Sequence, residues 1–136
     1  MILMDTSVLI SARTGLDLWG SVVPDETPLF SALSYAELTF GIATARDRDT
    51  RADRQENLAW IESLGVRWLP FDRRAGDGYS VVGAEVQKTR PAHARSKDIL
   101  LAGQAYSLGA SIATLNPKDF ELVSDLVKII GPGQAE

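Results

Sequence analysis

Short apolar runs alternate along most of the chain with longer segments in which apolar residues recur at helical spacing. Four of these runs predict strands, at residues 1–4, 29–33, 66–71 and 111–115. The longer segments predict helices at residues 34–45, 51–64, 73–89 and 96–108. This alternation is typical of an α/β domain, in which helices cover both faces of a mainly parallel sheet.

Chain breakers close three of the predicted helices. Gly65 and Gly109 each follow a helical segment, where a glycine often ends a helix, and Pro91 stops the segment that begins near residue 73. No internal repeat, low-complexity segment or linker interrupts the pattern. The pattern therefore predicts one domain over residues 1–130, followed by a frayed tail over residues 131–136.

The scarcity of two residue types excludes whole classes of site. The chain has no cysteine, which excludes thiol nucleophiles, disulfides and cysteine-bound zinc, and its one histidine is His93. A Ser-His-Asp triad would have to use that residue, so any chemistry rests largely on carboxylates and hydroxyls. The first residues lack a basic leader and no apolar stretch is long enough to span a membrane, so we expect a cytoplasmic protein without membrane association.

The positions of four acids are more informative than the number of acids. Asp5 directly follows the first predicted strand, and Glu37 lies just past the second. Asp98 opens the last predicted helix, and Asp119 follows the strand at residues 111–115. In an open parallel sheet, the C-terminal ends of the strands and the first turns of the following helices line one crevice, where ligands bind. We therefore expect these four side chains to converge.

Helix capping offers an alternative role for three of these acids. Ser34 and Glu37 have the spacing of a capping box, and Asp98 lies in a first turn, where the helix dipole stabilises an acid. Asn116 has the position of an N-cap, with Asp119 in the first turn behind it. Each of these positions is therefore explained by helix structure alone.

Capping does not explain why four acids should converge. Asp5 fits a cap and a ligand equally well, and clustered carboxylates repel one another unless a cation is present. Oxygen ligands of this kind imply a hard ion, Mg²⁺ or Mn²⁺. The formal net charge of -4, from 18 acidic and 14 basic residues, argues mildly against a nucleic-acid coat protein; without these four acids the chain is balanced at 14 of each sign.

One segment is purely basic and leads directly into Asp98. Between Glu85 and Asp98 there is no acid, and the segment predicts a rim that contacts phosphates, as a nucleic acid would supply. The candidate contacts are Lys88, Arg90, Arg95 and Lys97. The alternative is a solvated surface loop, and His93, in the same segment, is interpreted as a surface histidine.

Four segments match a known family in order and spacing over nearly the whole chain. They are Met-Asp-Thr-Ser-Val-Leu-Ile at residues 4–10, Ser-Tyr-Ala-Glu-Leu at 34–38 with Gly41, Asp-Ile-Leu-Leu-Ala-Gly-Gln-Ala at 98–105, and Thr-Leu-Asn-Pro-Lys-Asp-Phe at 114–120. Together they resemble the PIN-domain ribonucleases, and within them the VapC-type toxins of bacterial toxin-antitoxin pairs. Leu100, Leu101 and Gly103 depart from the Ile and Ala usual there, which affects packing detail rather than chemistry.

The resemblance implies a fold, an activity and partners. The fold is a PIN-like three-layer α/β/α domain with a mainly parallel central sheet. The activity is that of a Mg²⁺-dependent endoribonuclease toxin, with Mn²⁺ as a possible substitute, that cuts structured RNA such as tRNA or rRNA. The implied partners are a second copy of the chain, in a homodimer, and a cognate VapB-type antitoxin that neutralises the toxin.

The resemblance also assigns residues. The implied catalytic acids are Asp5, Glu37, Asp98 and Asp119. Asp5 and Asp98 are the implied metal ligands, and Glu37 and Asp119 are further candidates. Residues that would orient these ligands are Thr6, Ser7, Thr114 and Asn116. Whether Asp119 or Asn116 faces the metal stays open.

The expected mechanism is in-line hydrolysis of an RNA phosphodiester. A carboxylate such as Glu37 would help to deprotonate a water activated by Mg²⁺.

Two other classes of protein compete with this interpretation. A metal-dependent phosphatase would use a strand-terminal Asp as nucleophile, but the Asp-Thr-Ser start lacks the second acid two residues on that such enzymes usually carry. In a catalytically silent binding module, the acids would only cap helices.

Overall fold

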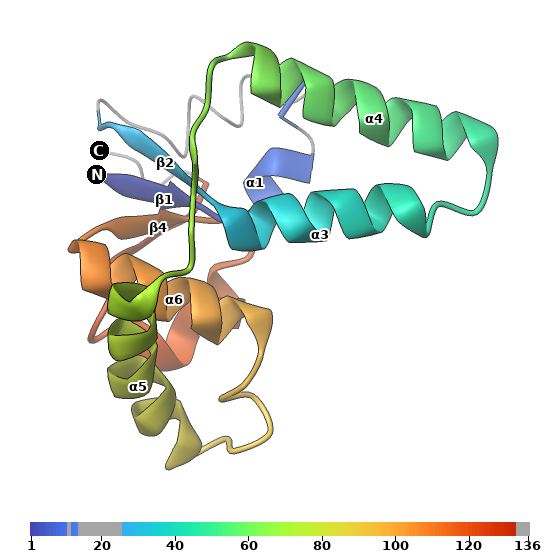
Figure 1. The fold of residues 1–136 in the computed structure, drawn as a ribbon. Helices are drawn as coiled ribbons and strands as arrows, with labels where there is room; N and C mark the ends of the chain where they lie inside the picture. Colours follow the sequence, from blue (N-terminus) through green and yellow to red (C-terminus); the bar gives the residue numbers. More distant parts are fainter. Residues whose placement is uncertain (11, 14–25, 133–136) are drawn as a thin grey trace.

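The central sheet is parallel throughout. The computed structural model describes residues 1–10, 12–13 and 26–132. Within these residues five strands pair in the order β3-β2-β1-β4-β5. Figure 1 labels three of them, β2, β1 and β4, side by side. The strands are β1 (Ile2–Met4), β2 (Pro28–Ser31), β3 (Trp68–Leu69), β4 (Ser111–Ala113) and β5 (Ile129–Ile130). The predicted α/β class with a mainly parallel sheet is therefore confirmed.

Three of the strands lie within the predicted runs, β2 begins one residue before its predicted run, and β5 was not predicted. Ile129 and Ile130 of β5 pair with Ile112 and Ala113 of β4. The segment is short and its neighbours include Lys128, so it lacks a long apolar run. Gly131, in the predicted tail, is buried, and residues 133–136 lie outside the described residues.

The helices begin at polar caps. They are α1 (Thr6–Ile10), α3 (Ala32–Ala43), α4 (Arg48–Ser63), α5 (Arg73–Gln87), α6 (Lys97–Leu108) and the 3₁₀ helix η1 (Pro117–Val123). α4 begins three residues before its predicted start, because the Asp47 carboxylate accepts a hydrogen bond from the Thr50 N–H at 2.7 Å. Gly65 and Gly109 have positive φ angles of 74° and 65°, which confirms both as helix-ending glycines.

The predicted capping box of Ser34 and Glu37 is wrong. The N-cap of α3 is Ser31, whose hydroxyl accepts a hydrogen bond from the Leu33 N–H at 3.0 Å. Ser34 is buried inside the helix, and Glu37 lies in its second turn. Because β2 ends at Ser31 and α3 begins at Ala32, no gap separates strand from helix. Glu37 is therefore free of a capping role.

Two hydrophobic clusters show the three layers. On one face of the sheet, Leu3 packs with residues of α5, α6 and η1, such as Val82 and Ile99. On the other face, Ile2 packs with residues of α1 and α4, such as Leu9 and Ile61. Successive residues of β1 thus point to opposite sides, as expected for a strand covered on both faces. The predicted three-layer α/β/α arrangement is confirmed.

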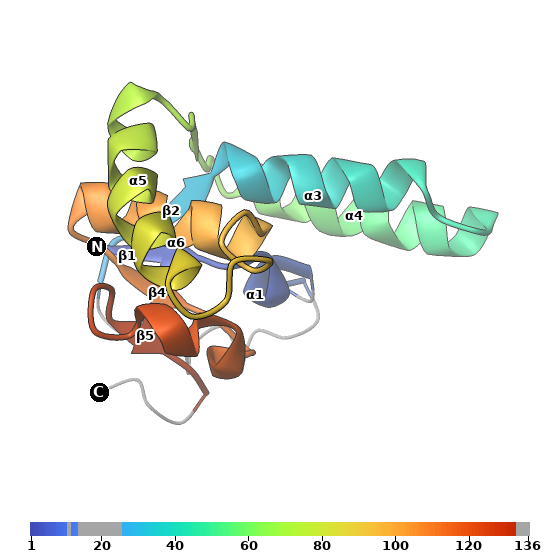
Figure 2. The ribbon, with the colours of Figure 1, turned by 90° about the horizontal axis from the view of Figure 1, so that it is seen from below.

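The two layers of helices differ in how closely they are held. α5 and α6 cross at close range: a Cβ added to Gly103 would lie 2.4 Å from the Cα of Tyr79. By contrast, the α3–α4 hairpin, which comprises the two helices and residues 44–47, projects beyond the sheet in both ribbon views (Figures 1 and 2). None of the described helices combines the length and apolar character that a membrane crossing needs.

Candidate active site

The predicted acids come from four elements and meet near the C-terminal ends of β1 and β4. Asp5 follows β1 directly, and its N–H donates to the carbonyl of Ala113 at the end of β4, at 2.9 Å. Glu37 lies in α3 and Asp98 in the first turn of α6. Asp119 lies in the first turn of η1. The site thus occupies the edge of the sheet where ligands bind in open α/β folds.

Two hydroxyl groups orient the carboxylate of Asp5. Ser7 Oγ donates to Asp5 Oδ2 at 2.7 Å, and Thr114 Oγ1 donates to the same oxygen at 2.8 Å. Burial is the largest influence on the pKa of Asp5 and raises it, and the charge of Glu37 raises it further. The two hydroxyl hydrogen bonds and one from the Thr6 backbone lower the pKa, but the net result is a raised pKa. Asp5 is therefore a fixed side chain whose ionised form is penalised by its surroundings.

Glu37 is held from two sides. Thr6 Oγ1 donates to Glu37 Oε1 at 2.9 Å and is itself 3.0 Å from the buried hydroxyl of Ser34. The ammonium of Lys97 lies 3.1 Å from Glu37 Oε2. Thr6 thus orients Glu37, while Ser7 and Thr114 orient Asp5. Both carboxylates are positioned by polar contacts from other segments of the chain.

The electrostatics of Asp98 show that the four acids are close together. Burial raises its pKa most, followed by the charges of Asp5, Asp119 and Glu37, while His93 lowers it; the resulting pKa is about 6. Each of the other three acids therefore lies close enough to repel a negative charge on Asp98. The other three acids thus act electrostatically on Asp98 in the folded chain.

The sequence left open whether Asp119 or Asn116 faces the metal. Both side chains are more exposed than those of Asp5, Glu37 and Asp98. Both are exposed, and neither side chain makes a hydrogen bond or ion pair within the described residues. Asn116 contributes through its backbone, since its N–H donates to Thr114 Oγ1 at 3.0 Å. Asp119 contributes a charge that acts on Asp98. Of the two, Asp119 is the one whose side chain influences the site.

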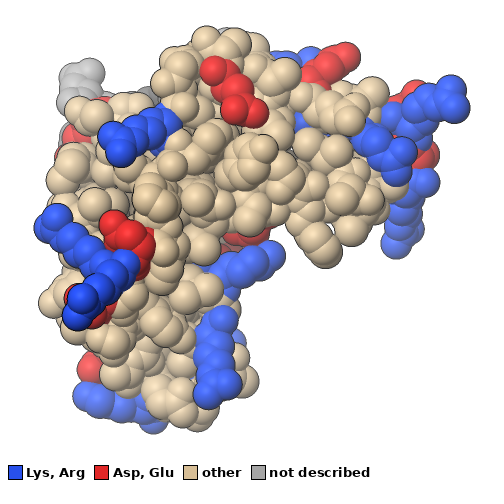
Figure 3. Space-filling model, viewed as in Figure 1, with Lys and Arg blue, Asp and Glu red and all other residues tan. Residues whose placement is uncertain are grey.

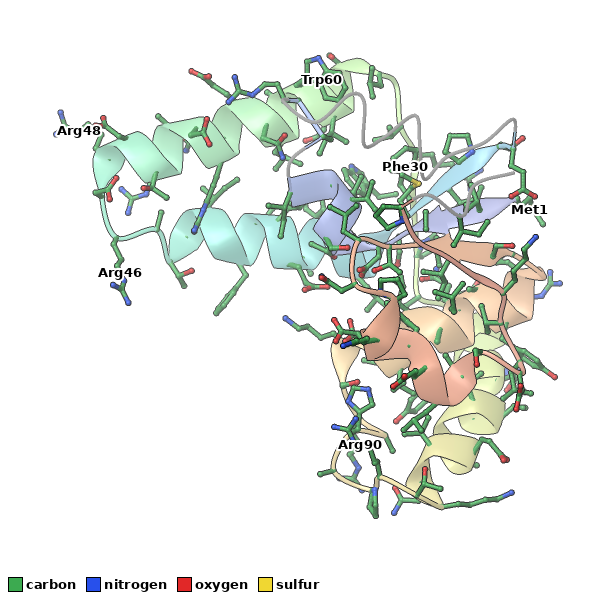
Figure 4. All side chains as sticks on the ribbon, turned by 180° about the vertical axis from the view of Figure 1, so that it is seen from behind. Met1, Phe30, Arg46, Arg48, Trp60 and Arg90 are labelled. Carbon is green, nitrogen blue, oxygen red and sulfur yellow. The ribbon has the colours of Figure 1, made fainter. Side chains whose placement is uncertain are left out.

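The basic segment is divided between paired and unpaired side chains. Lys88 pairs with Glu85 at 2.9 Å, and Lys97 pairs with Glu37. Arg90 and Arg95 are exposed and form no ion pair within the described part of the chain. Blue side chains gather over the loop between α5 and α6 (Figure 3), where Figure 4 labels Arg90. The segment therefore keeps two free cations at the surface.

Two features of the site were missed by sequence reasoning. Ser34 was interpreted as a cap but instead contacts Thr6, which holds Glu37. Its position one helical turn before Glu37, on the same face of the helix, was the available signal. Lys97 was interpreted only as an RNA contact, and nothing in the sequence links it to Glu37, which is 60 residues earlier.

The donors at the site fit a hard divalent cation. All of them are oxygen atoms, and the mutual repulsion of the acids is what a cation would relieve. Among the described residues, no group of three or more acidic or histidine side chains is placed so that it could hold an ion by itself. Mg²⁺ usually retains several waters and binds through one or two carboxylates, which is fewer ligands than such a group would supply.

Comparisons with known proteins reveal relatives by structure only. No family model and no curated protein matches the sequence. Among solved structures, VapBC-5 from Mycobacterium tuberculosis, of the VapBC family of toxin-antitoxin systems, is 25% identical with a TM-score of 0.77, over 95% of this chain and 96% of that one.

Two further structures share the fold. VapBC2 from Rickettsia felis, bound to a DNA fragment from its promoter, is 20% identical with a TM-score of 0.74, over 96% of this chain and 99% of that one. FitAcB from Neisseria gonorrhoeae is 22% identical with a TM-score of 0.73, over 97% and 98%. The structural neighbours of this chain are thus VapC-type PIN-domain toxins of VapBC complexes, and its fold is theirs.

Proposed function

We propose that the chain is the toxin of a VapBC-type pair and a Mg²⁺-dependent endoribonuclease that hydrolyses phosphodiester bonds of structured RNA. The observation that carries the proposal is that Thr6, Ser7 and Thr114 hold Asp5 and Glu37, from separate segments, at the ends of the strands, where burial and the charges of the other acids raise the pKa of Asp98. Helix capping needs no such convergence. The likeness to VapBC-5 supports the toxin assignment.

In this proposal the site residues have three roles: binding the metal, orienting the carboxylates and accepting a proton. Asp5 and Asp98 would hold Mg²⁺, or Mn²⁺ in its place, with Glu37 and Asp119 as further ligands. When bound, the ion activates water and neutralises charge that develops on the phosphate. Ser7 and Thr114 keep the Asp5 carboxylate in one orientation. Glu37 is the base that takes a proton from the attacking water, and Thr6 fixes its direction.

RNA is held by the basic segment. Arg90 and Arg95 are free to contact phosphates, and Lys88 and Lys97 extend the same surface once they leave their acids. Replacing both arginines by Gln should weaken RNA binding and lower the slope of log affinity against log salt by about 1 to 2. Arg48→Gln, at the far end of the α3–α4 hairpin (Figure 4), is the matched control. An unchanged slope in the double variant would favour the solvated loop.

The partners we propose are a cognate antitoxin and a second copy of the chain. A hollow of about 200 Å³ lies beside the site and is lined by Ile10, Glu37, Leu38, Gly41, Arg54 and Asn57. An antitoxin segment over this hollow could bring a basic side chain to the carboxylates and thereby compete with Mg²⁺. We expect the pair to act in the cytoplasm, where RNA is available.

The decisive experiment is cleavage of total bacterial RNA by the purified, folded chain. Discrete fragments should appear with Mg²⁺ or Mn²⁺ and disappear with a chelator. Asp98→Asn should lower the cleavage rate by more than about a hundredfold, because it removes a ligand charge rather than a group that merely orients one. Asp125→Asn, at an exposed acid in the turn after η1, should leave cleavage unchanged.

Other results of this experiment would redirect the assignment. Hydrolysis of a small phosphoester without RNA cleavage would favour the metal-dependent phosphatase. A folded chain, shown to be free of antitoxin, that cleaves nothing and is not stabilised by Mg²⁺ would favour the silent binding module.

A further inference from the structure

The ion pair between Lys97 and Glu37 links α6 to α3 at the candidate site. Lys97 is the first residue of α6, directly before Asp98, and Glu37 belongs to α3. The ammonium of Lys97 lies 3.1 Å from Glu37 Oε2. The Lys97 side chain is 68% exposed and that of Glu37 is 27% exposed. The exposed ammonium of Lys97 is therefore paired with the partly buried carboxylate of Glu37.

The same pair places a positive charge beside one of the four acids. Glu37 Oε1 accepts the hydroxyl of Thr6, and Oε2 faces Lys97, so both oxygens of this carboxylate are engaged. Glu37 is also one of the charges that raise the pKa of Asp98. An ammonium placed on Glu37 thus offsets part of the negative charge that the cluster otherwise carries alone.

We propose that Lys97 is a built-in counter-ion of the metal-free site, which an incoming Mg²⁺ must displace from Glu37. The proposal rests on the proposed function, because it assumes that the four acids bind Mg²⁺. Two cations beside one carboxylate repel each other, so a singly charged ammonium gives way to a divalent ion. Lys97 is 68% exposed, and its flexible stem lets it withdraw into solvent. Lys97 is thus a positioning residue that sets the affinity for Mg²⁺.

A second lysine provides a matched control. Lys118 stands directly before Asp119, as Lys97 stands before Asp98, and it is exposed on η1. Within the described residues Lys118 forms no ion pair. Removing either lysine removes one positive charge next to a site acid, but only removal of Lys97 frees Glu37. A difference between the two variants therefore reports the ion pair rather than net charge.

The test is calorimetric titration of the chelator-treated protein with Mg²⁺ at low ionic strength. Lys97→Met should bind Mg²⁺ about threefold more tightly than the wild type, the scale expected for an exposed ion pair. Lys118→Met should change the affinity clearly less, and Lys97→Arg should restore the wild-type value. High salt should shrink the difference, because it screens the pair. Thermal unfolding without metal should show each variant folded.

A double-mutant cycle separates the ion pair from long-range charge. In a Glu37→Gln background, Lys97→Met should no longer change the Mg²⁺ affinity. The inference is overturned if Lys97→Met binds Mg²⁺ no more tightly than the wild type, if Lys118→Met gains as much, or if the gain persists in the Glu37→Gln background. Absence of Mg²⁺ binding by the wild-type chain would instead overturn the proposed function itself, and the inference with it.

Discussion

Helices α3 and α6 have the same length, and each brings one acid to the site, but they are anchored in opposite ways. Both contain 12 residues. Six residues of α6 are buried, whereas Ser34 is the single buried residue of α3. Asp98 is consequently placed by a helix that is part of the core. Glu37 is placed by polar contacts with Thr6 and Lys97.

The difference also decides what each helix offers to the outside. α3 exposes large apolar side chains: Phe40 is 67% and Tyr35 is 37% exposed, and Ile10 of the adjacent α1 is 63% exposed. Exposed apolar groups that gather on one element are typical of a surface that meets another protein. One helix thus serves the core, and the other combines a site acid with a face suited to the proposed partners.

The same glycine-to-alanine change should have opposite effects in the two helices. In Gly103→Ala the new Cβ would lie 2.4 Å from the Cα of Tyr79, so α5 and α6 must move apart, and we expect a loss of about 2–3 kcal/mol in the free energy of unfolding. In Gly41→Ala the nearest atom is Arg54 Nη1 at 3.8 Å, so the better helix former should add about 0.5–1 kcal/mol.

Urea unfolding of both variants measures this contrast. A Gly103→Ala variant as stable as the wild type would show that the crossing of α5 and α6 is looser than the described contacts. A destabilised Gly41→Ala variant would show that α3 is packed more tightly than its exposure indicates.

The raised pKa of Asp98 should make the free energy of unfolding depend on pH. Burial and the neighbouring acids raise its pKa from 3.8 to about 6, so the folded protein retains a proton there that the unfolded chain has lost. The free energy of unfolding therefore falls as pH rises through this window, and ionised Asp98 destabilises the metal-free protein above it. Asp98→Asn should stabilise the chain at neutral pH by about 1 kcal/mol, a value discounted because the carboxyl is partly exposed.

Unfolding in the presence of chelator, at neutral pH and at about pH 4, tests this sign. The gain from Asp98→Asn should become much smaller at the lower pH, where the folded wild-type carboxyl is protonated and a large share of the unfolded chains carries the proton as well. Mg²⁺ should raise the melting temperature of the wild type but not of the variant. An Asp98→Asn variant less stable than the wild type at neutral pH would contradict the raised pKa.

The smallest effect is expected at the exposed face of α3. Phe40→Ser should change the free energy of unfolding by less than about 0.5 kcal/mol, because the side chain lies in solvent. It should nevertheless reduce self-association or capture by an antitoxin, if the face has the role proposed above. Sedimentation and unfolding of the same sample measure both quantities. A large loss of stability would place Phe40 in a core that the structure does not show.

Local patterns predicted the fold well where one apolar run corresponds to one element. The runs at residues 1–4 and 111–115 contain β1 and β4, which are buried on both faces. The run at residues 29–33 was harder, because it joins the end of β2 to the start of α3 and hides the cap at Ser31. β5 was missed because two paired residues leave no periodic signal; only pairing with β4 makes them a strand.

For the site, the sequence predicted which acids lie near the strand ends but not how their side chains are held. The acids could be found because each lies at a strand end or in a first helical turn, and sheet topology brings such positions together. The partners of Glu37 could not be found in this way. Thr6 and Lys97 reach it from segments far along the chain, and such contacts depend on how α1 and α6 are turned against α3.

The position of β1 in the middle of the sheet has a consequence for synthesis on the ribosome. Its register partners in β4 begin at Ser111, and Thr114 completes the hydrogen bonds to Asp5. During synthesis β1 is therefore paired on both sides only after β4 has been made. Contacts between residues so far apart in the sequence form late. A nascent chain carries the acids long before it can arrange them. The candidate site thus cannot assemble until synthesis has passed Thr114.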